Sequence, residues 1–177
     1  MRFVVACLLA GLTWALPAAA EDGVRDLNSI IRSLALLEYL PEHSGKPRVD
    51  LDVRFQVNSA TLTRQARRQL DELGGALKSE RLAGQRFRIV GHTDASGGAA
   101  YNKRLSQQRA KAVKAYLVAR HRIDAASLES IGMGEEQLKN PLRPKAGLNR
   151  RVEVLALGSP PGTKVKSKRS GERKIKW

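Results

Sequence analysis

The residues best suited to chemistry gather in one polar, glycine-rich stretch and in the segment after it. Gly91-His92-Thr93-Asp94-Ala95-Ser96-Gly97-Gly98 follows residues 86–90, which have the composition of a buried strand. From Asn102 to about His121, apolar side chains recur at spacings of three, four and seven, which predicts an amphipathic helix. Loops past the end of a strand and near a helix N-terminus commonly hold ligands. We therefore expect a binding site here.

Two opposite charges stand out in this stretch. Arg109 lies four residues after Leu105 and four before Val113, on the apolar side of the predicted helix. A guanidinium there needs a partner, because an unpaired buried charge is strongly destabilising. Asp94 is the carboxylate expected nearby. The two could form a structural salt bridge, or they could receive a zwitterionic group, which needs one fixed anion and one fixed cation.

Three sequence blocks resemble a known family. They are Gly91-His92-Thr93-Asp94 with Gly97, then Asn102, Leu105, Ser106, Arg109 and Ala110, and finally Asn149-Arg150-Arg151-Val152-Glu153. Over residues 49–157 the chain resembles the OmpA C-terminal-like (OmpA/MotB) family of peptidoglycan-binding domains. Three blocks in the family's order make this resemblance more specific than any single short motif.

The resemblance implies non-catalytic binding of peptidoglycan through the meso-diaminopimelate of its stem peptide. In the family, the aspartate matching Asp94 holds the amino group of diaminopimelate, and the arginine matching Arg109 holds a carboxylate of the same residue. The resemblance also implies weaker ligand-binding candidates: Asn58, Ser96, Asn102, Thr93, Leu105, Arg150 and Arg151.

Several of these weaker candidates have an ordinary structural interpretation as well. Asn58 is equally a turn-forming residue, and Asn102 is able to cap the helix. Arginines near a strand end, such as Arg150 and Arg151, often only brace a neighbouring carboxylate, here Glu153. Both interpretations stay open for each residue.

The sequence gives little support for an enzyme. His43, His92 and His121 show no metal-ligand spacing beyond the weak His92-x-Asp94, and no serine lies in a nucleophile-elbow pattern. We therefore expect no catalytic residue, no metal and no cofactor.

The first twenty residues have the pattern of a secretory signal peptide. Arg2 precedes an apolar run over residues 3–16, and Ala18-Ala19-Ala20 offers a cleavage site. A retained membrane anchor is the alternative, although the run is short for a bilayer span. No later stretch is apolar enough to cross a membrane, so we expect no transmembrane segment after cleavage. With the resemblance, this predicts a periplasmic protein, with the cell wall and the outer membrane as candidate sites of association.

The charge of the chain favours anionic partners. The net charge is +15 at pH 7, which attracts acidic wall polymer or anionic lipid. Export makes nucleic acid an unexpected partner. The basic tail, residues 158–177, lacks apolar spacing and is expected to be disordered. Whether its charge serves solubility or attraction to the envelope stays open.

The segments around the site predict one α+β domain over residues 49–157. Strands are expected at 49–55, 86–90, 128–131 and 150–157, and helices at 63–77 and 102–121. The order β-α-β-α-β-β predicts a two-layer sandwich, a mixed sheet with helices on one face. OmpA-like domains share this architecture.

Residues 21–48 form an N-terminal helix and linker that precede that domain. Asp26 caps a predicted amphipathic helix that Pro41 ends. Its apolar stripe is Leu27, Ile30, Ile31, Leu34, Leu37 and Leu40. We expect this stripe either to pack against the domain or to bind another envelope protein.

The sequence thus predicts a wall-binding protein that tethers or organises the envelope. The alternative is an envelope adaptor or a basic polyanion binder in which the wall site is secondary.

Overall fold

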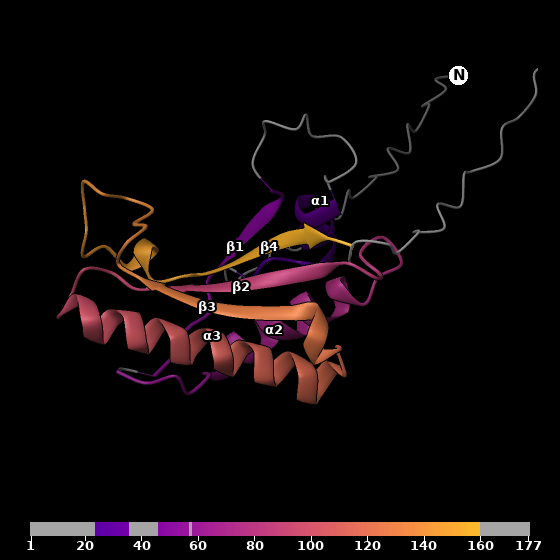
Figure 1. Ribbon diagram of the computed structural model, residues 1–177, viewed down its shortest axis with the longest axis horizontal. Coiled ribbons are helices and arrows are strands. Elements are labelled where there is room, and N and C mark those ends of the chain that lie inside the picture. The colour runs from indigo at the N-terminus through magenta and orange to yellow at the C-terminus, as the bar shows by residue number, and fades with distance from the viewer. Residues whose placement is uncertain (1–23, 36–45, 57, 160–177) are drawn as a thin grey trace, which may run out of the picture.

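The computed structural model describes residues 24–35, 46–56 and 58–159 (Figure 1). In chain order, the elements are α1 Leu27–Leu34, β1 Arg48–Leu51, α2 Arg64–Leu77, β2 Arg86–His92, α3 Ala99–His121, the 3₁₀ turn η2 Ala125–Ser127, β3 Leu128–Gly134, the 3₁₀ turn η3 Gly147–Asn149 and β4 Val152–Gly158. The predicted signal peptide, the second half of the predicted N-terminal helix and nearly all of the basic tail lie outside the described residues.

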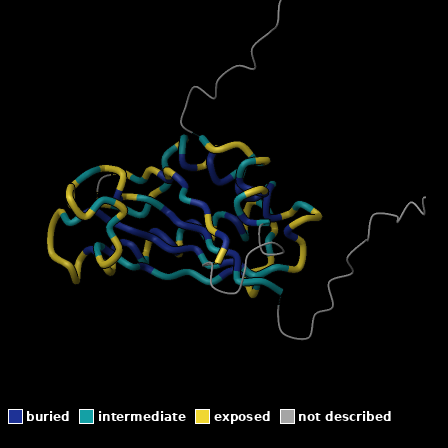
Figure 2. The backbone as a smooth tube through the Cα atoms, turned by 90° about the horizontal axis from the view of Figure 1, so that it is seen from above, coloured by how far each residue is buried: buried dark blue, intermediate teal, exposed yellow. Residues whose placement is uncertain are grey.

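The strands form one four-stranded sheet in the order β1-β4-β2-β3. β4 is antiparallel to both β1 and β2, whereas β2 and β3 are parallel and joined through α3. The mixed sheet confirms the predicted α+β class. The core lies on the sheet face that carries Ile89 and Val154, which are register partners and fully buried, and it includes Leu70 of α2 and Val113 of α3. In Figure 2 the buried backbone runs through the middle of the molecule and exposed loops surround it.

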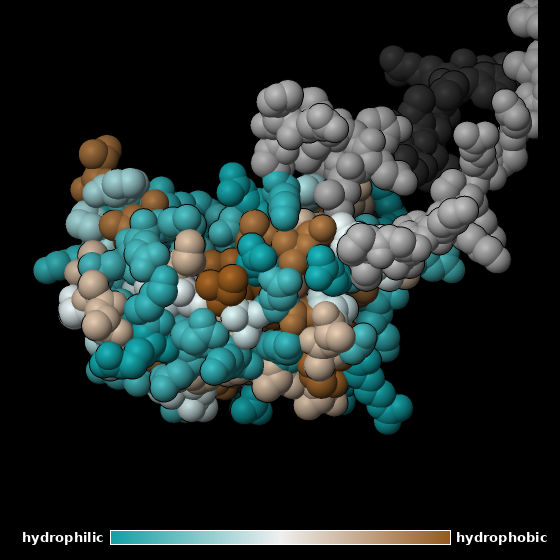
Figure 3. Space-filling model, in the orientation of Figure 1, coloured by the Kyte–Doolittle hydropathy of each residue, from teal (hydrophilic) through white to brown (hydrophobic). Residues whose placement is uncertain are grey.

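The other face of the sheet is largely charged. Arg88 and Glu129 are register partners on β2 and β3, and their side chains form a salt bridge of 2.8 Å. Such cross-strand pairs stabilise adjacent strands on an exposed face. The surface in Figure 3 is mostly hydrophilic, with a limited apolar area over the strands. No helix among the described residues is long and apolar enough to span a membrane.

Two glycines let α3 approach the sheet closely. A Cβ atom at Gly91 would lie 2.4 Å from the Ser106 carbonyl oxygen, and one at Gly132 would lie 2.2 Å from the Gln107 nitrogen. Hydrogen bonds complete the contact, because the Gly132 and Gly134 amides donate to the Gln107 and Ser106 side chains. The first half of α3 is therefore fixed against the ends of β2 and β3, where the polar loop begins.

The first predicted strand is shorter than expected. Alternation suggested a strand from Val49 to Phe55, but β1 ends at Leu51. The Val53 amide donates to the Leu51 carbonyl at 3.0 Å, which turns the chain away from the sheet. Phe55 then pairs with Leu62 in an isolated antiparallel bridge. The Gln56 amide donates to the Thr61 carbonyl, and the Thr63 amide donates to the Arg54 carbonyl. Residues 54–56 and 58–63 thus form a folded-back segment.

The N-terminal helix packs on the domain in its described part. The Asp26 carboxylate accepts a hydrogen bond from the Ser29 amide, as a cap should. Ile30 and Leu34 are fully buried in the same core as the sheet and α2. Because these side chains are already covered, they are not free for another protein. Leu37 and Leu40 lie outside the described residues, and the domain division at residues 48 and 49 stays a prediction.

We predict that α1 contributes to the stability of the fold. Leu34→Ala removes a fully buried side chain and should lower the free energy of unfolding by about 2–5 kcal/mol. Urea denaturation measures this change. Arg32→Ala, on the exposed side of the same helix, serves as the control and should change stability little. Equal stabilities for Leu34→Ala and the unaltered protein would show that α1 is an appendage to the fold.

Candidate functional site

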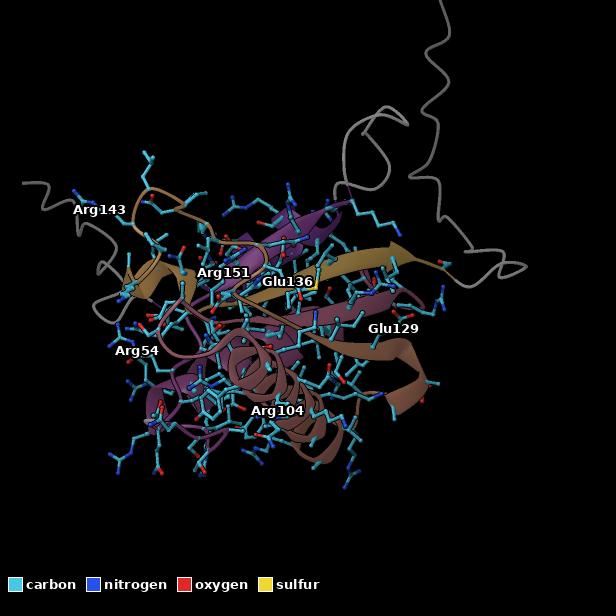
Figure 4. The ribbon with its side chains drawn as sticks, turned by 60° about the vertical axis from the view of Figure 1, so that its left-hand side comes forward. Arg54, Arg104, Glu129, Glu136, Arg143 and Arg151 are labelled. Atoms are coloured by element: carbon cyan, nitrogen blue, oxygen red, sulfur yellow. The ribbon has the colours of Figure 1, made fainter. Side chains whose placement is uncertain are left out.

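A cavity of about 930 Å³ opens where β2 ends. The polar loop after β2, the folded-back segment before α2 and the turn before β4 form its walls. Its lining includes every ligand-binding residue predicted from the sequence: Asn58, Thr93, Asp94, Ser96, Asn102, Leu105, Arg109, Arg150 and Arg151. Figure 4 labels two of the lining arginines, Arg54 and Arg151, and also Arg104 on the exposed side of α3. Residues far apart in sequence are therefore brought into one site.

Asp94 lies at the cavity wall with most of its side chain covered. One carboxylate oxygen, Oδ1, accepts a hydrogen bond from the Ser96 amide at 3.0 Å, and Oδ2 accepts one from Arg150 Nη1 at 2.5 Å. Burial raises the pKa of Asp94, but the hydrogen bonds from Arg150 and Ser96 outweigh burial. The pKa therefore lies below its ordinary value of 3.8, and Asp94 is an anion at neutral pH.

Arg109 projects from the inward side of α3, as its spacing predicted, and is 9% exposed. Its Nε donates to the Ser59 carbonyl at 3.0 Å, and its guanidinium lies 4.9 Å above the centre of the Phe55 ring. Burial lowers the pKa of Arg109 below its ordinary value of 12.5, yet a guanidinium stays charged at neutral pH. Within the described part of the chain, no carboxylate forms a salt bridge with it.

Of the two alternatives that the sequence left open, the direct salt bridge between Asp94 and Arg109 is not formed among the described residues. Asp94 pairs with Arg150, from the turn before β4, while a carbonyl and an aromatic ring compensate Arg109. A structural salt bridge between Asp94 and Arg109 is thus not what holds the site together. Arg109 instead brings to the cavity lining a positive charge that forms no salt bridge with a carboxylate of the described residues.

Asn102 organises the polar loop from the first turn of α3. It does not cap the helix, because α3 begins at Ala99 and its cap residue is Gly98. The buried Asn102 side chain donates to the Ser96 carbonyl at 3.1 Å and to Glu135 Oε2 at 2.6 Å. These bonds hold the loop that carries Asp94.

Asn149 performs the same task on the other side of the cavity. Its side chain is fully buried. It accepts from the Asn140 amide at 2.8 Å and donates to the Arg143 and Pro144 carbonyls, both at 3.0 Å. The Pro144 carbonyl also accepts from the Ala95 amide. Asn149 therefore ties residues 140–148 to the loop of Asp94.

The remaining predicted residues differ in how they meet the cavity. Thr93 is buried, and its Oγ1 has no hydrogen-bond partner among the described residues. Leu105 is buried, whereas Ser96 is exposed. Asn58 lies in a turn with a φ of 50°, a left-handed conformation that asparagine tolerates. Arg151 braces its surroundings: its Nε lies 3.4 Å from Asp50 Oδ1, and its Nη1 and Nη2 donate to the Gln137 carbonyl.

Sequence reasoning missed four residues that shape the site. Phe55 and Ser59 contact Arg109 from the folded-back segment, and Tyr101 and Arg54 also line the cavity. Phe55 had been assigned only to a strand. No local pattern relates it to an arginine on a helix that begins more than forty residues later. Asn149 belongs to the third sequence block that resembles the family, but the resemblance did not indicate that its side chain points inward.

A buried contact between a histidine and a glutamate supports the strand end behind the site. The side chain of His92 is fully buried, and its Nε2 lies 3.3 Å from Glu153 Oε2. The hydrogen bond with His92 lowers the pKa of Glu153 despite the opposing effect of burial. His92 thus has a structural partner at the end of β2, in keeping with the ordinary interpretation of a histidine at a strand end.

We predict that Asn149→Ala loosens the loop over residues 140–148. The substitution removes the acceptor of the Asn140 amide and one of the two donors to each of the Arg143 and Pro144 carbonyls. It should lower stability by about 1–3 kcal/mol. Amide hydrogen exchange should accelerate at Asn140 and Ala95. Asn28→Ala, on the exposed side of α1, is the control. Unchanged exchange at both amides would show that Asn149 does not organise this loop.

Comparison with known proteins places the chain in a family. A profile of the OmpA family matches residues 54–152. The peptidoglycan-associated lipoprotein of Pseudomonas aeruginosa is 38% identical over 108 residues, which cover 56% of this chain and 58% of that protein. Outer membrane porin F of the same organism is 31% identical over 109 residues, covering 60% of this chain and 31% of porin F.

A solved structure has the same architecture. An outer membrane protein from Borrelia burgdorferi B31 superposes with a TM-score of 0.51 at 25% identity, covering 64% of this chain and 92% of that one. The fold, the order of the three sequence blocks and a profile match over more than half of the chain agree. The chain belongs to the OmpA family.

Proposed function

We propose that this protein binds peptidoglycan without catalysis, through the diaminopimelate of the stem peptide. The observation that carries this proposal is the buried Arg109 guanidinium, which lines the same cavity as the Asp94 carboxylate and has no carboxylate partner among the described residues. The free end of the diaminopimelate side chain bears one ammonium and one carboxylate on the same carbon. A site with one fixed anion and one fixed cation matches this pair of charges.

Arg109 is suited to the carboxylate of the ligand. Its Nε is already engaged with the Ser59 carbonyl, which fixes the plane of the guanidinium. Among the described residues no hydrogen bond is made by its terminal nitrogens, so these remain for a carboxylate. Hydrogen bonds between a guanidinium and a carboxylate are charge-assisted and strong, and removal from water strengthens them further.

Asp94 is suited to the ammonium. Its low pKa keeps it ionised over the whole physiological range. The Ser96 amide and the loop bonds of Asn102 fix its position before a ligand arrives. A preorganised charge loses less conformational entropy on binding than a mobile one.

The relatives support the wider role. One relative is named for its association with peptidoglycan, and another is an outer membrane porin. We propose that this chain acts in the periplasm, where wall binding tethers or organises the envelope. The roles of Asn58, Thr93, Ser96 and Leu105 as ligand contacts belong to the same proposal.

The two charged residues are tested by substitutions that remove the charge and keep a polar side chain. Asp94→Asn and Arg109→Gln should each weaken binding of the stem peptide by about 10- to 150-fold, because hydrogen bonds to charged groups contribute roughly 1.5–3 kcal/mol. Calorimetry with the soluble peptide and retention on purified sacculi are the measurements. Glu80→Gln and Arg104→Gln are the matched controls, since both side chains are exposed and outside the cavity lining.

Thermal melting must show each variant to be folded, because Arg109 is buried. A folded Asp94→Asn protein that keeps full affinity would contradict the proposal. So would equal affinity for a stem peptide with lysine, which lacks the side-chain carboxylate, in place of diaminopimelate.

The pH dependence of binding follows from Asp94. Because its pKa lies below the ordinary value of 3.8, the Asp94 carboxylate is ionised at pH 5 and above, and its charge is lost only as the pH falls through that lower pKa. Affinity for the stem peptide should therefore stay level from pH 7 to pH 5 and decline only in stronger acid. A loss of affinity between pH 7 and pH 5, with the protein still folded, would mean that a different group supplies the anion.

A further inference from the structure

Asp94 already has a cationic partner in the free protein. Arg150 Nη1 lies 2.5 Å from Asp94 Oδ2, and the Ser96 amide occupies Oδ1. A ligand ammonium can therefore reach the carboxylate only if Arg150 shares it or moves away. In the free protein, Arg150 therefore occupies the carboxylate that the proposed function assigns to the ligand ammonium.

Arg150 is free to move, whereas Asp94 is not. The Arg150 side chain is 54% exposed, and the Asp94 side chain is 10% exposed. Ion pairs with an exposed partner contribute little net stability, because water competes for the charge and ordering a long side chain opposes pairing. An incoming ammonium that makes the same contact can replace the guanidinium at small free-energy cost.

The place of Arg150 is nevertheless defined. The Arg150 amide donates to the Gly147 carbonyl at 3.0 Å, and a Cβ atom at Gly147 would lie 3.0 Å from Arg150 Nη2. The guanidinium therefore rests on the backbone of η3, at the wall of the cavity. A guanidinium that leaves Asp94 and keeps this contact with the backbone remains at the cavity wall.

The charges do not balance with a simple zwitterion. The cavity lining also holds Asp52, which pairs with Arg54, and Asp50, which pairs with Lys139 and Arg151. Around the proposed ligand site this leaves one anion, Asp94, and two cations, Arg109 and Arg150. Burial is the main reason that the pKa of Arg109 is lowered, and the nearby charge of Arg150 contributes to the same effect. A ligand with one ammonium and one carboxylate satisfies Asp94 and Arg109 but leaves Arg150 without a partner. A second anion on the ligand would satisfy it.

We infer that Arg150 determines specificity by exchange: the ligand ammonium takes its place on Asp94, and Arg150 pairs with a second carboxylate of the same stem peptide. This inference rests on the proposed function. The preferred ligand then carries two carboxylates around one ammonium, and stem peptides neutralised by amidation bind less well. The second carboxylate is the α-carboxylate of D-glutamate or the C-terminal carboxylate of diaminopimelate.

Three peptides and one substitution test the inference. The reference peptide is N-acetylated L-alanyl-γ-D-glutamyl-meso-diaminopimelate, and each of the other two has one of these candidate carboxylates converted to an amide. Calorimetry gives their affinities for the full chain and for Arg150→Gln. The unaltered protein should bind one amide about tenfold more weakly than the reference peptide, and that amide identifies the carboxylate. Arg150→Gln should bind the reference peptide and that amide alike.

Two further variants separate a specific contact from general electrostatics. Arg104→Gln removes an exposed guanidinium outside the cavity lining and should preserve discrimination between the peptides. Arg150→Lys keeps a mobile positive charge and should retain part of the discrimination. Melting curves confirm that Arg150→Gln is folded, as expected for a half-exposed side chain.

Two results would overturn the inference. If the unaltered protein binds all three peptides alike, no second carboxylate is recognised. If Arg150→Gln changes all three affinities by the same factor, Arg150 only competes for Asp94 or only shapes the loop. Both results leave the proposed function intact. Failure of the unaltered protein to bind any of the peptides would instead refute the proposed function, and the inference with it.

Discussion

A buried positive charge without a carboxylate of its own is the constraint around which this site is built. Arg109 projects inward from α3, where water is largely excluded, and contacts the Ser59 carbonyl and the face of Phe55. Among the described residues no carboxylate forms a salt bridge with it. A carbonyl dipole and an aromatic quadrupole offset part of the desolvation of a guanidinium, but less than a carboxylate would. In the free protein the desolvation penalty of the Arg109 guanidinium is thus only partly offset, and an anionic ligand can offset the rest.

The irregular segments around this charge need fixed positions, and buried amide side chains provide them. Asn102 and Asn149 bind backbone groups of two loops that have no ladder of their own, and the Pro144 carbonyl joins the two loops through the Ala95 amide. On the helical side, Gly91 and Gly132 bring α3 into backbone contact with the sheet. Because loops and helix are each anchored to the same strand ends, the distances across the cavity are set by the sheet.

Much of this architecture was predictable from periodicity, and the charge pairing was not. Alternation and helical spacing gave the strands, the helices and the inward position of Arg109, because each depends on residues close in sequence. Asp94 pairs with Arg150 and not with Arg109. The sequence could not predict this pairing, because residues 135–148 show no hydrophobic periodicity from which the position of Arg150 could be inferred. The contact of Phe55 with Arg109 was missed for a similar reason. Apolar and charged residues alternate through Val53 as in a strand, although the chain turns after Leu51.

We propose that a carboxylate of the ligand pairs with Arg109 while its ammonium pairs with Asp94. Nitrogen NMR during titration with the N-acetylated tripeptide tests it most directly. The Nε signal of Arg109 reports on the guanidinium, and the Ser96 amide, which donates to Asp94, reports on the carboxylate. We expect both signals to shift and to reach saturation at the same peptide concentration. Saturable shifts elsewhere, with these two signals unmoved, would contradict it.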